Sequence, residues 1–170
     1  DAVREKHGRL HILVNNAGIG PTSPVEEMDF TDWRRIMSIN IDGVFLGVKT
    51  FVPMLAAGGA EVTGGASIIN VSSMYGIVGA VDTSAYNASK GAVRMFTKGI
   101  ALEFATKKMP IRANSLHPGF VLTPLLNAGF QRWVDAGAAA ARAPRGLLPV
   151  ELEAEVHRPA VGDGLGDEHA

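Results

Sequence analysis

A tyrosine and a lysine stand four residues apart in the segment Tyr86-Asn87-Ala88-Ser89-Lys90. Within a helix, this spacing places the phenol and the ammonium group on one face. A free tyrosine has a pKa of about 10 and is a poor acid–base catalyst near neutrality. A cation held beside the ring stabilises the phenolate, so the pair predicts a lowered tyrosine pKa and proton-transfer chemistry. The alternative is a surface pair with no chemical role.

Two further polar residues could serve the same chemistry. Ser73 lies 13 residues before Tyr86 and at the carboxyl end of a predicted strand, where ligands bind in open α/β sheets. Its hydroxyl could bind a substrate oxygen, although Ser72 and Ser73 could equally do no more than end the strand. Asn40 falls among apolar residues inside a predicted helix and needs a polar partner. Capping a kink in that helix is the alternative for Asn40.

Strands and helices alternate along the chain and would position these residues. Apolar runs predict strands at residues 11–14, 66–71 and 111–117, and helical periodicity predicts helices at 29–55 and from 83 or 84 to 108. This alternation predicts an α/β fold in which three parallel strands, in chain order, form a sheet with helices on both faces. Residues 1–8 look like the last turns of a helix closed by Gly8, which suggests that material is missing upstream.

Two more motifs follow the first and the third predicted strand. They are Asn15-Asn16-Ala17-Gly18 and Pro118-Gly119-Phe120-Val121-Leu122-Thr123-Pro124. Together with Asn40, Ser73 and residues 86–90, in this order and spacing, they resemble the short-chain dehydrogenase/reductase family over residues 1–128, and its secondary-alcohol dehydrogenases in particular. The resemblance implies a Rossmann-type, doubly wound parallel sheet. It also implies NAD(P)-dependent interconversion of a secondary alcohol and a ketone.

The resemblance further implies a role for each residue of the motifs. Tyr86 would exchange a proton with the substrate oxygen, while Lys90 would lower the pKa of Tyr86 and bind the nicotinamide ribose. Ser73 would orient the substrate carbonyl, and Asn40 would hold a water that links Lys90 to solvent. Cofactor contacts would come from Asn16, Ala17 and Gly18 beside the adenine ribose, and from Pro118, Gly119, Val121 and Thr123 around the nicotinamide carboxamide.

The chain departs from the family at both ends. The family's phosphate loop, G-x-x-x-G-x-G, should follow a strand and open a helix, and no such segment is present. We therefore expect a partial sheet without the first βαβαβ half, without the residue that selects NAD or NADP, and inactive alone. Residues 1–143 would form a partial dinucleotide-binding and catalytic domain. Residues 144–170, rich in Ala, Arg, Gly and Pro, would be an atypical, poorly ordered tail that resembles a gene read out of frame.

Composition excludes several other classes. The 170 residues are 46% hydrophobic and carry a net charge of -1, which favours a soluble globular protein and argues against nucleic-acid binding. Without cysteine there is no thiolate site, and the histidines lack ligand spacing, so we expect no metal. Lys49 and Pro53 break the apolar stretch at 43–60, so no membrane span is expected. No export leader opens the chain, so a cytoplasmic location is expected.

The main alternative to an oxidoreductase is a non-catalytic relic or self-association module of the same fold. Small residues at positions 43, 47, 88 and 92 suit close helix packing. Members of the family usually associate as tetramers through two long helices, so the resemblance implies a homo-oligomer. A hydrolase is disfavoured because neither H-E-x-x-H nor G-x-S-x-G occurs. The expected partners are therefore a small alcohol or ketone and NAD or NADP.

Overall fold

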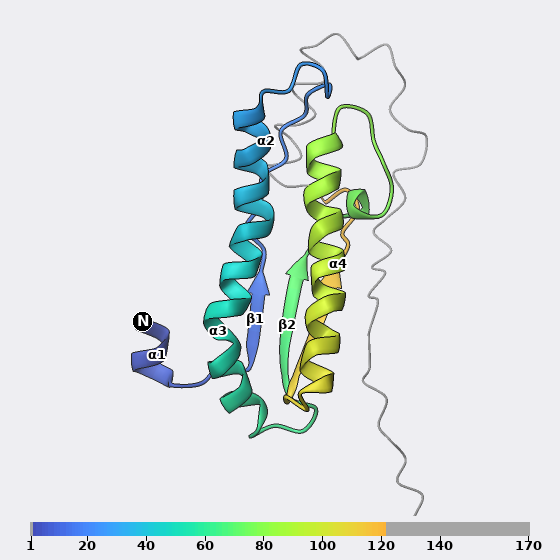
Figure 1. Cartoon of the computed structure of the whole chain (residues 1–170). Coiled ribbons are helices and arrows are strands. Elements are labelled where there is room, and N and C mark those ends of the chain that lie inside the picture. The colour runs from blue at the N-terminus through green and yellow to red at the C-terminus, as the bar shows by residue number, and fades with distance from the viewer. Residues whose placement is uncertain (1, 122–170) are drawn as a thin grey trace, which may run out of the picture.

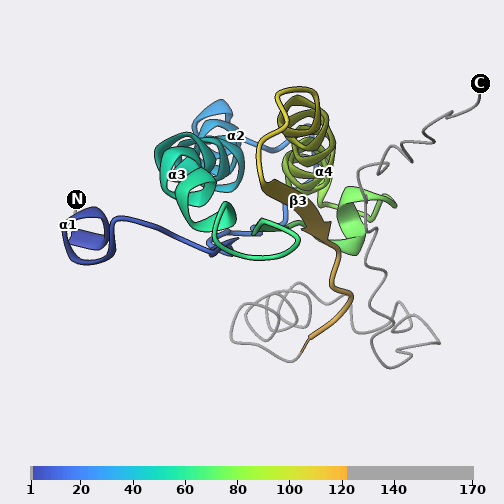
Figure 2. The same ribbon diagram turned by 90° about the horizontal axis from the view of Figure 1, so that it is seen from below.

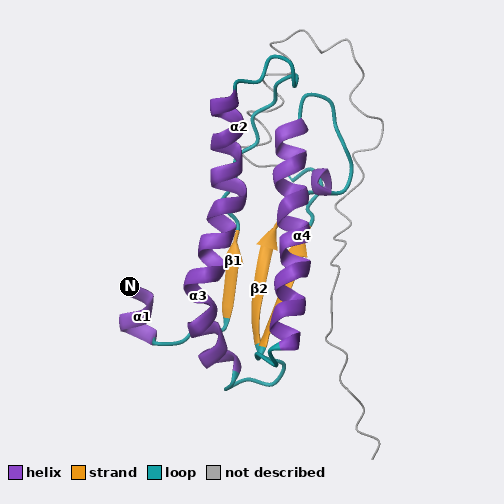
Figure 3. Ribbon diagram, viewed as in Figure 1, coloured by secondary structure: helices purple, strands orange, loops and turns teal. Residues whose placement is uncertain are grey.

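A computed structural model describes residues 2–121 of the chain. The expected tail at 144–170 and the candidate residue Thr123 lie outside this range. Strands and helices alternate through the described part (Figures 1 and 3). The elements are α1 (Ala2–His7), β1 (Ile12–Asn15), α2 (Phe30–Met37), a π-helical segment η1 (Ser38–Asp42), α3 (Gly43–Gly59), β2 (Ala66–Val71), a 3-10 turn η2 (Met74–Gly76), α4 (Ser84–Thr106) and β3 (Ile111–Leu116).

The three strands form one parallel sheet in the order β1-β2-β3. Ile12 of β1 pairs with Ser67 of β2, and Ala66 of β2 pairs with Ile111 of β3. Because the strands are parallel, their carboxyl ends meet at one edge of the sheet. The predicted α/β class, the strand positions and the parallel order are confirmed, with β1 displaced by one residue.

The helices that pack on the sheet lie on one face of it within the described residues. Figure 2 shows α3 and α4 on the same side of the strands. Each crossover moves the chain one strand further in the same direction, so two crossovers of the same hand place both helices on one face. The expectation of helices on both faces is therefore wrong for residues 2–121, because covering the second face requires a reversal of strand order that three sequential strands do not contain.

The hydrophobic core lies between this sheet face and the two long helices. Leu55 of α3 and Ile68 of β2 are fully buried at its centre, and Phe104 of α4 closes it. Burying a side chain of this size stabilises the fold by about 2 kcal/mol. The remaining core members are Val48, Ala66, Ile100, Ile111 and Ala113. This packing holds α4 against the sheet and so fixes the position of its first turns at the carboxyl edge.

The segments α2, η1 and α3 form one continuous helix, Phe30–Gly59. It passes through Pro53, which is exposed and has no backbone N–H to donate a helical hydrogen bond. The predicted end at residue 55 is therefore four residues early. An 18-residue window of this helix has a mean hydropathy of 1.4, so the helix is long and apolar enough to span a membrane by length and composition alone, contrary to our expectation. Buried helices in protein cores pass the same test, and Val48 and Leu55 of this helix lie in the core.

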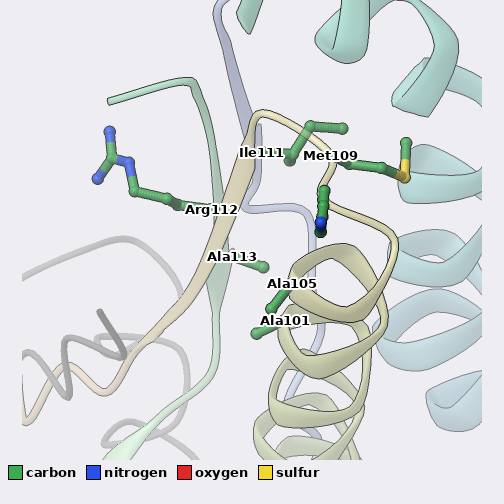
Figure 4. A pocket seen from close by; sticks show the side chains of 7 residues that line it. Ala101, Ala105, Met109, Ile111, Arg112 and Ala113 are labelled. Atoms are coloured by element: carbon green, nitrogen blue, oxygen red, sulfur yellow. The ribbon is translucent and has the colours of Figure 1, made fainter. Parts of the chain in front are cut away.

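Close backbone contacts occupy the opposite end of the sheet from the carboxyl edge. A side chain at Gly59 or Gly65 would collide with the Pro110 carbonyl group, and Gly65 also has a φ of +74°. These glycines therefore serve packing and a tight turn. A pocket of about 220 Å³ lies at this same end, between the last turns of α4 and the start of β3, with Met109 and Arg112 in its wall (Figure 4). It is remote from the carboxyl edge.

Strand β1 exposes two large apolar side chains on the uncovered sheet face. Ile12 is 60% exposed and Val14 is 52% exposed, and among the described residues β1 pairs only with β2. We predict that the 170-residue chain self-associates through β1, and that lysine at both positions lowers its light scattering markedly. Val81→Lys is the matched control, because Val81 is 74% exposed in a loop. An equal effect of Val81→Lys, or a monodisperse wild-type chain, would contradict the prediction.

Candidate active site

Four segments meet at the carboxyl edge of the sheet. Residues 16–20 follow β1, residues 72–76 follow β2, residues 117–121 follow β3, and the first turns of α4 pack beside them. Each segment carries at least one of the residues singled out from the sequence. This edge is where open α/β sheets bind their ligands.

Ser73 begins the 3-10 turn η2 directly after β2. It is buried in extended conformation, and its Oγ accepts a hydrogen bond of 3.2 Å from the Tyr75 backbone N–H. The backbone on either side is tied to β3, since Ser72 N–H donates to the Leu116 carbonyl and Met74 N–H to the Pro118 carbonyl. Ser73 does end the strand, as the structural alternative held, and its O–H hydrogen stays available for a second partner.

Tyr86 and Lys90 lie in the first two turns of α4, on the face directed at this edge. The Lys90 Nζ atom is 5.7 Å from the centroid of the Tyr86 ring. Both side chains are largely enclosed by protein, and the Ser73 hydroxyl is near enough to the Tyr86 phenol to lower the pKa of Tyr86. The structure therefore brings Ser73, Tyr86 and Lys90 together, as the sequence predicted.

The pKa of the Tyr86 phenol differs from our expectation. Burial raises the pKa of Tyr86 above the ordinary value of 10.0, the Ser73 hydroxyl lowers it by less, and the neighbouring Tyr75 phenol raises it. The predicted net lowering of the Tyr86 pKa is therefore wrong for the structure described. The physical reason is that desolvation of a phenolate outweighs its favourable interactions here. Near neutral pH the phenol is protonated, so it is suited to donate a proton.

Lys90 is a buried cation without a carboxylate partner among residues 2–121. Its ammonium group donates a 2.8 Å hydrogen bond to the Val71 carbonyl at the end of β2. Burial lowers the pKa of Lys90 from 10.5 to about 8. The Nζ atom retains further N–H donors, which point to an additional hydrogen-bond acceptor in the working site.

The lowered Lys90 pKa predicts a stability that depends on pH. Between about pH 8 and pH 10, the unfolded chain binds more protons at Lys90 than the folded chain does. The free energy of unfolding should therefore rise over this window, by about 1–2 kcal/mol. The raised Tyr86 pKa acts in the opposite direction only above its ordinary value of 10.0. Urea unfolding at several pH values measures the slope.

Lys90→Met is the control for this experiment, because it keeps an unbranched side chain and removes the titrating group. Its unfolding free energy should be flat over the same pH window. A flat wild-type profile, or an unchanged slope in Lys90→Met, would show that Lys90 is not the group responsible.

Asn40 lies inside η1, where the helix widens to a π-helical turn. The side chain is fully buried and forms two 2.8 Å hydrogen bonds with Ile19, one to each backbone polar group, and a third of 2.9 Å to Ser89 Oγ. Both amide hydrogens of Asn40 are thus used by protein groups. Asn40 therefore holds the turn after β1 against α4, and its side-chain hydrogen bonds go to these segments rather than to its own helix.

The turn after β1 passes close to the catalytic candidates. A Cβ atom at Gly18 would lie 3.2 Å from Lys90 Nζ, and one at Gly20 would lie 3.3 Å from the Tyr86 ring. The backbone at Gly18 and Gly20 thus packs closely against Lys90 and Tyr86, where a larger residue would be crowded. Asn16 and Ala17 are exposed at the same edge. The unused Lys90 donors suit a ligand with hydroxyl acceptors, such as the ribose of a dinucleotide.

The motif after β3 borders the other side of Ser73. Pro118 accepts the hydrogen bond from Met74 N–H, and Gly119 lies beside the Met74 sulfur. Val121 is exposed. Pro118, Gly119 and Val121 therefore lie at the expected edge, while the role of Thr123 stays a prediction.

Several residues at this edge were missed by sequence analysis. Tyr75 stands edge-on to both Tyr86 and Phe120, with ring centroids 6.5 Å and 5.9 Å apart. His117 is buried and contacts the Ser73 carbonyl group. Its signal in the sequence was its position immediately before the Pro-Gly turn. No group of three potential metal ligands occurs among the described residues.

Comparison with known proteins matches this arrangement to one family. The sequence profile of the short chain dehydrogenase family matches residues 1–132. The chain belongs to the short-chain dehydrogenases. The chain is 43% identical over 127 residues to the NADP-dependent (R)-specific alcohol dehydrogenase of Lentilactobacillus kefiri. The matched region covers 75% of this chain and 49% of the relative. It is 45% identical over 160 residues to the cyclopentanol dehydrogenase of Comamonas testosteroni, or 94% and 58% of the two chains.

Solved structures show the same fold over the same portion of the chain. Aldohexose dehydrogenase of Thermoplasma acidophilum superposes with a TM-score of 0.69 at 31% identity, over 85% of this chain and 51% of that one. Levodione reductase superposes with a TM-score of 0.72 at 30% identity, over 82% and 52%. This short-chain dehydrogenase chain therefore spans about half the length of most of the curated relatives it matches.

Proposed function

We propose that these residues form the catalytic half of an oxidoreductase that interconverts a secondary alcohol and a ketone, with NAD or NADP as the hydride carrier. The observation that carries the proposal is the meeting of Ser73, Tyr86 and Lys90 at the carboxyl edge of a parallel sheet. Their chemistry, a hydrogen-bond donor, a proton donor and a cation, matches the needs of a carbonyl oxygen that gains negative charge.

The nicotinamide ring, when bound, supplies or accepts the hydride. Ser73 would donate its O–H to the substrate oxygen and so orient the carbonyl group. Tyr86 would give its phenolic proton to the same oxygen in ketone reduction and take it back in alcohol oxidation. Lys90, charged below a pH of about 8, would stabilise the phenolate while the proton is on the substrate.

The residues that border Tyr86 would hold the cofactor. Residues 16–18 would lie beside the adenine ribose, and Lys90 would use its free donors on the nicotinamide ribose. Pro118, Gly119 and Val121, together with Thr123, would surround the nicotinamide carboxamide. The side chain that selects NAD or NADP is expected in the half of the fold that this chain does not span.

The substrate side of the site is expected to be apolar. Met74, Tyr75 and Phe120 border Ser73, and the rings of Tyr75 and Phe120 are in edge-to-face contact. Such a wall favours a substrate with a hydrocarbon skeleton next to the reacting carbon. This agrees with a secondary alcohol or ketone as the partner, and we expect the protein to work in the cytoplasm.

Self-association is the second candidate function, and a specific surface favours it. The outer sides of α3 and α4 expose four large apolar residues, Phe45, Leu46, Met95 and Leu102. Phe45 also contacts Phe96 across the two helices, with ring centroids 6.3 Å apart. A homo-oligomer through α3 and α4 would cover this surface. Such an oligomer is compatible both with an active enzyme and with a non-catalytic relic.

Activity is tested in a chimera that we call the completed chain. It joins the N-terminal half of the Lentilactobacillus kefiri enzyme to this chain. Absorbance at the reduced-nicotinamide band is followed with a panel of cyclic and aromatic secondary alcohols, using NAD and NADP separately. We expect oxidation of secondary alcohols and little activity on primary ones. A completed chain that folds and binds the cofactor but oxidises no secondary alcohol would reject the proposed activity and favour the relic.

A further inference from the structure

His117 lies one residue beyond β3 and is buried beside Ser73. The ring uses both nitrogens: Nδ1 is 3.1 Å from the Ser73 carbonyl oxygen and Nε2 is 2.8 Å from Ser115 Oγ. All three residues are more than nine-tenths buried. A buried histidine with two specific partners, one of them the backbone of the candidate catalytic serine, is more than a packing residue.

The partners determine which nitrogen carries the proton. A carbonyl oxygen can only accept, so Nδ1 must be the donor toward Ser73. In the neutral ring, Nε2 is then an acceptor, and the Ser115 hydroxyl donates to it. Ser115 Oγ–H therefore donates to His117 Nε2, and His117 Nδ1–H donates to the Ser73 carbonyl oxygen. The Ser73 carbonyl therefore selects the tautomer, and the Ser115 hydroxyl, which can donate or accept, adapts to it as the partner of Nε2.

The contact between His117 and the Ser73 carbonyl acts on the residue that is proposed to orient the substrate. Ser73 is already held through its neighbours, because Ser72 and Met74 donate backbone hydrogen bonds to the chain around His117. The Ser73 carbonyl oxygen also accepts a hydrogen bond of 2.9 Å from the Gly76 N–H within the 3-10 turn. The His117 ring adds a second donor to the same oxygen and ties it to the end of β3. The direction of the Ser73 Cα–Cβ bond follows the orientation of this peptide group.

We infer that His117 is a positioning residue, which helps to fix the Ser73 hydroxyl toward the substrate by binding the Ser73 carbonyl from Nδ1, with Ser115 as the partner of Nε2. The catalytic consequence rests on the proposed function, whereas the contact does not. The expected effect on catalysis is about tenfold, because a small misplacement of a reacting group lowers rates strongly.

The contact is tested by NMR on the 170-residue chain labelled with ¹⁵N and ¹³C. Long-range ¹⁵N–¹H correlation should show the His117 proton on Nδ1, the minor tautomer of free histidine. The signals are assigned by their loss in His117→Asn. Ser115→Ala, a small change that the fold should tolerate, removes the partner of Nε2 and should leave the proton on Nδ1, because the Ser73 carbonyl can only accept. A wild-type His117 with its proton on Nε2 would overturn the inference.

Two isosteric variants separate positioning from packing. The Asn side chain places its amide nitrogen near the position of Nδ1, whereas that of Gln reaches the position of Nε2. His117→Asn should therefore retain the carbonyl ¹³C shift of Ser73, and His117→Gln should change it. In the completed chain, kcat should stay within about threefold for His117→Asn and fall about tenfold for His117→Gln, with KM for the cofactor unchanged in both.

The outcomes distinguish the inference from the proposed function. Equal effects of Asn and Gln on the Ser73 carbonyl shift would reduce His117 to a packing residue. If the Gln variant does not fold, Ser115→Ala and the tautomer measurement decide the question by themselves. A completed chain without turnover would reject the proposed function. The contact would still be established by a proton on His117 Nδ1 and by a Ser73 carbonyl ¹³C shift that His117→Asn retains and His117→Gln changes.

Discussion

Replacing Tyr86 by Phe in the completed chain should lower kcat by about 10²–10⁴-fold, the usual contribution of a positioned proton donor. The phenol lies near the Ser73 hydroxyl and beside Lys90, and burial raises its pKa, so it is protonated near neutral pH. Phe keeps the ring packing and removes only the transferable proton. Cofactor affinity, measured by fluorescence titration, should change less than about twofold, since Tyr86→Phe leaves the Lys90 ammonium in place.

Tyr75→Phe is the matched control for this prediction. Tyr75 is the other tyrosine of the chain, lies 6.5 Å from the Tyr86 ring and also has its pKa raised by burial. Loss of its hydroxyl should change kcat by no more than about threefold. Retained activity in Tyr86→Phe, or an equal loss in Tyr75→Phe, would remove Tyr86 from the assigned role.

The 170-residue polypeptide by itself should not reduce a ketone at micromolar NADH or NADPH. Dinucleotide affinity in this fold draws on a pyrophosphate bound at a helix N-terminus after a glycine-rich turn, and residues 2–121 contain no such turn between a strand and a helix. Each missing charge-assisted hydrogen bond costs about 1.5–3 kcal/mol, so two or three weaken binding by several orders of magnitude.

Calorimetric titration of both cofactors into the 170-residue chain and into the completed chain measures this difference. We expect no saturable binding to the first and micromolar binding to the second. Folding of the 170-residue chain is checked by the chemical-shift dispersion of its NMR spectrum. Measurable ketone reduction by the 170-residue chain would show that the pyrophosphate contacts are dispensable and would overturn this prediction.

The strands and the meeting of the catalytic candidates were predictable from the sequence for a simple reason. Buried parallel strands are continuous apolar runs, and their carboxyl ends must share an edge. Ser73, directly after the run at 66–71, therefore had to lie near the residues that follow the other strands. The four-residue spacing of Tyr86 and Lys90 then oriented both toward that edge.

Tertiary contacts explain what the sequence did not predict. The helix at 30–59 continues through Pro53 and packs Val48 and Leu55 in the core, which local propensity does not reveal. Both helices occupy one sheet face because the strand order is sequential. The role of Asn40 depends on a turn 21 residues away, where it binds Ile19. Only its unusual polarity within a helix could be noticed beforehand.

Electrostatics and single side chains were the least predictable features. The direction of the Tyr86 pKa shift depends on whether burial or the polar contacts of the phenol have the larger effect. The spacing of residues along a helix shows neither. His117 appeared in the sequence as one histidine among five. Its contact with Ser73 exists only because β2 and β3 are neighbours in the sheet, so that residues 44 positions apart meet.

Deuterium transfer in the completed chain tests the central claim most directly. A ketone is incubated with a reduced cofactor that carries deuterium at nicotinamide C4, and the alcohol product is analysed by mass spectrometry and NMR. The account predicts one deuterium at the carbinol carbon with wild-type Tyr86 and, over the same time, almost none with Tyr86→Phe. A completed chain that binds the reduced cofactor and the ketone but forms no deuterated alcohol would contradict it.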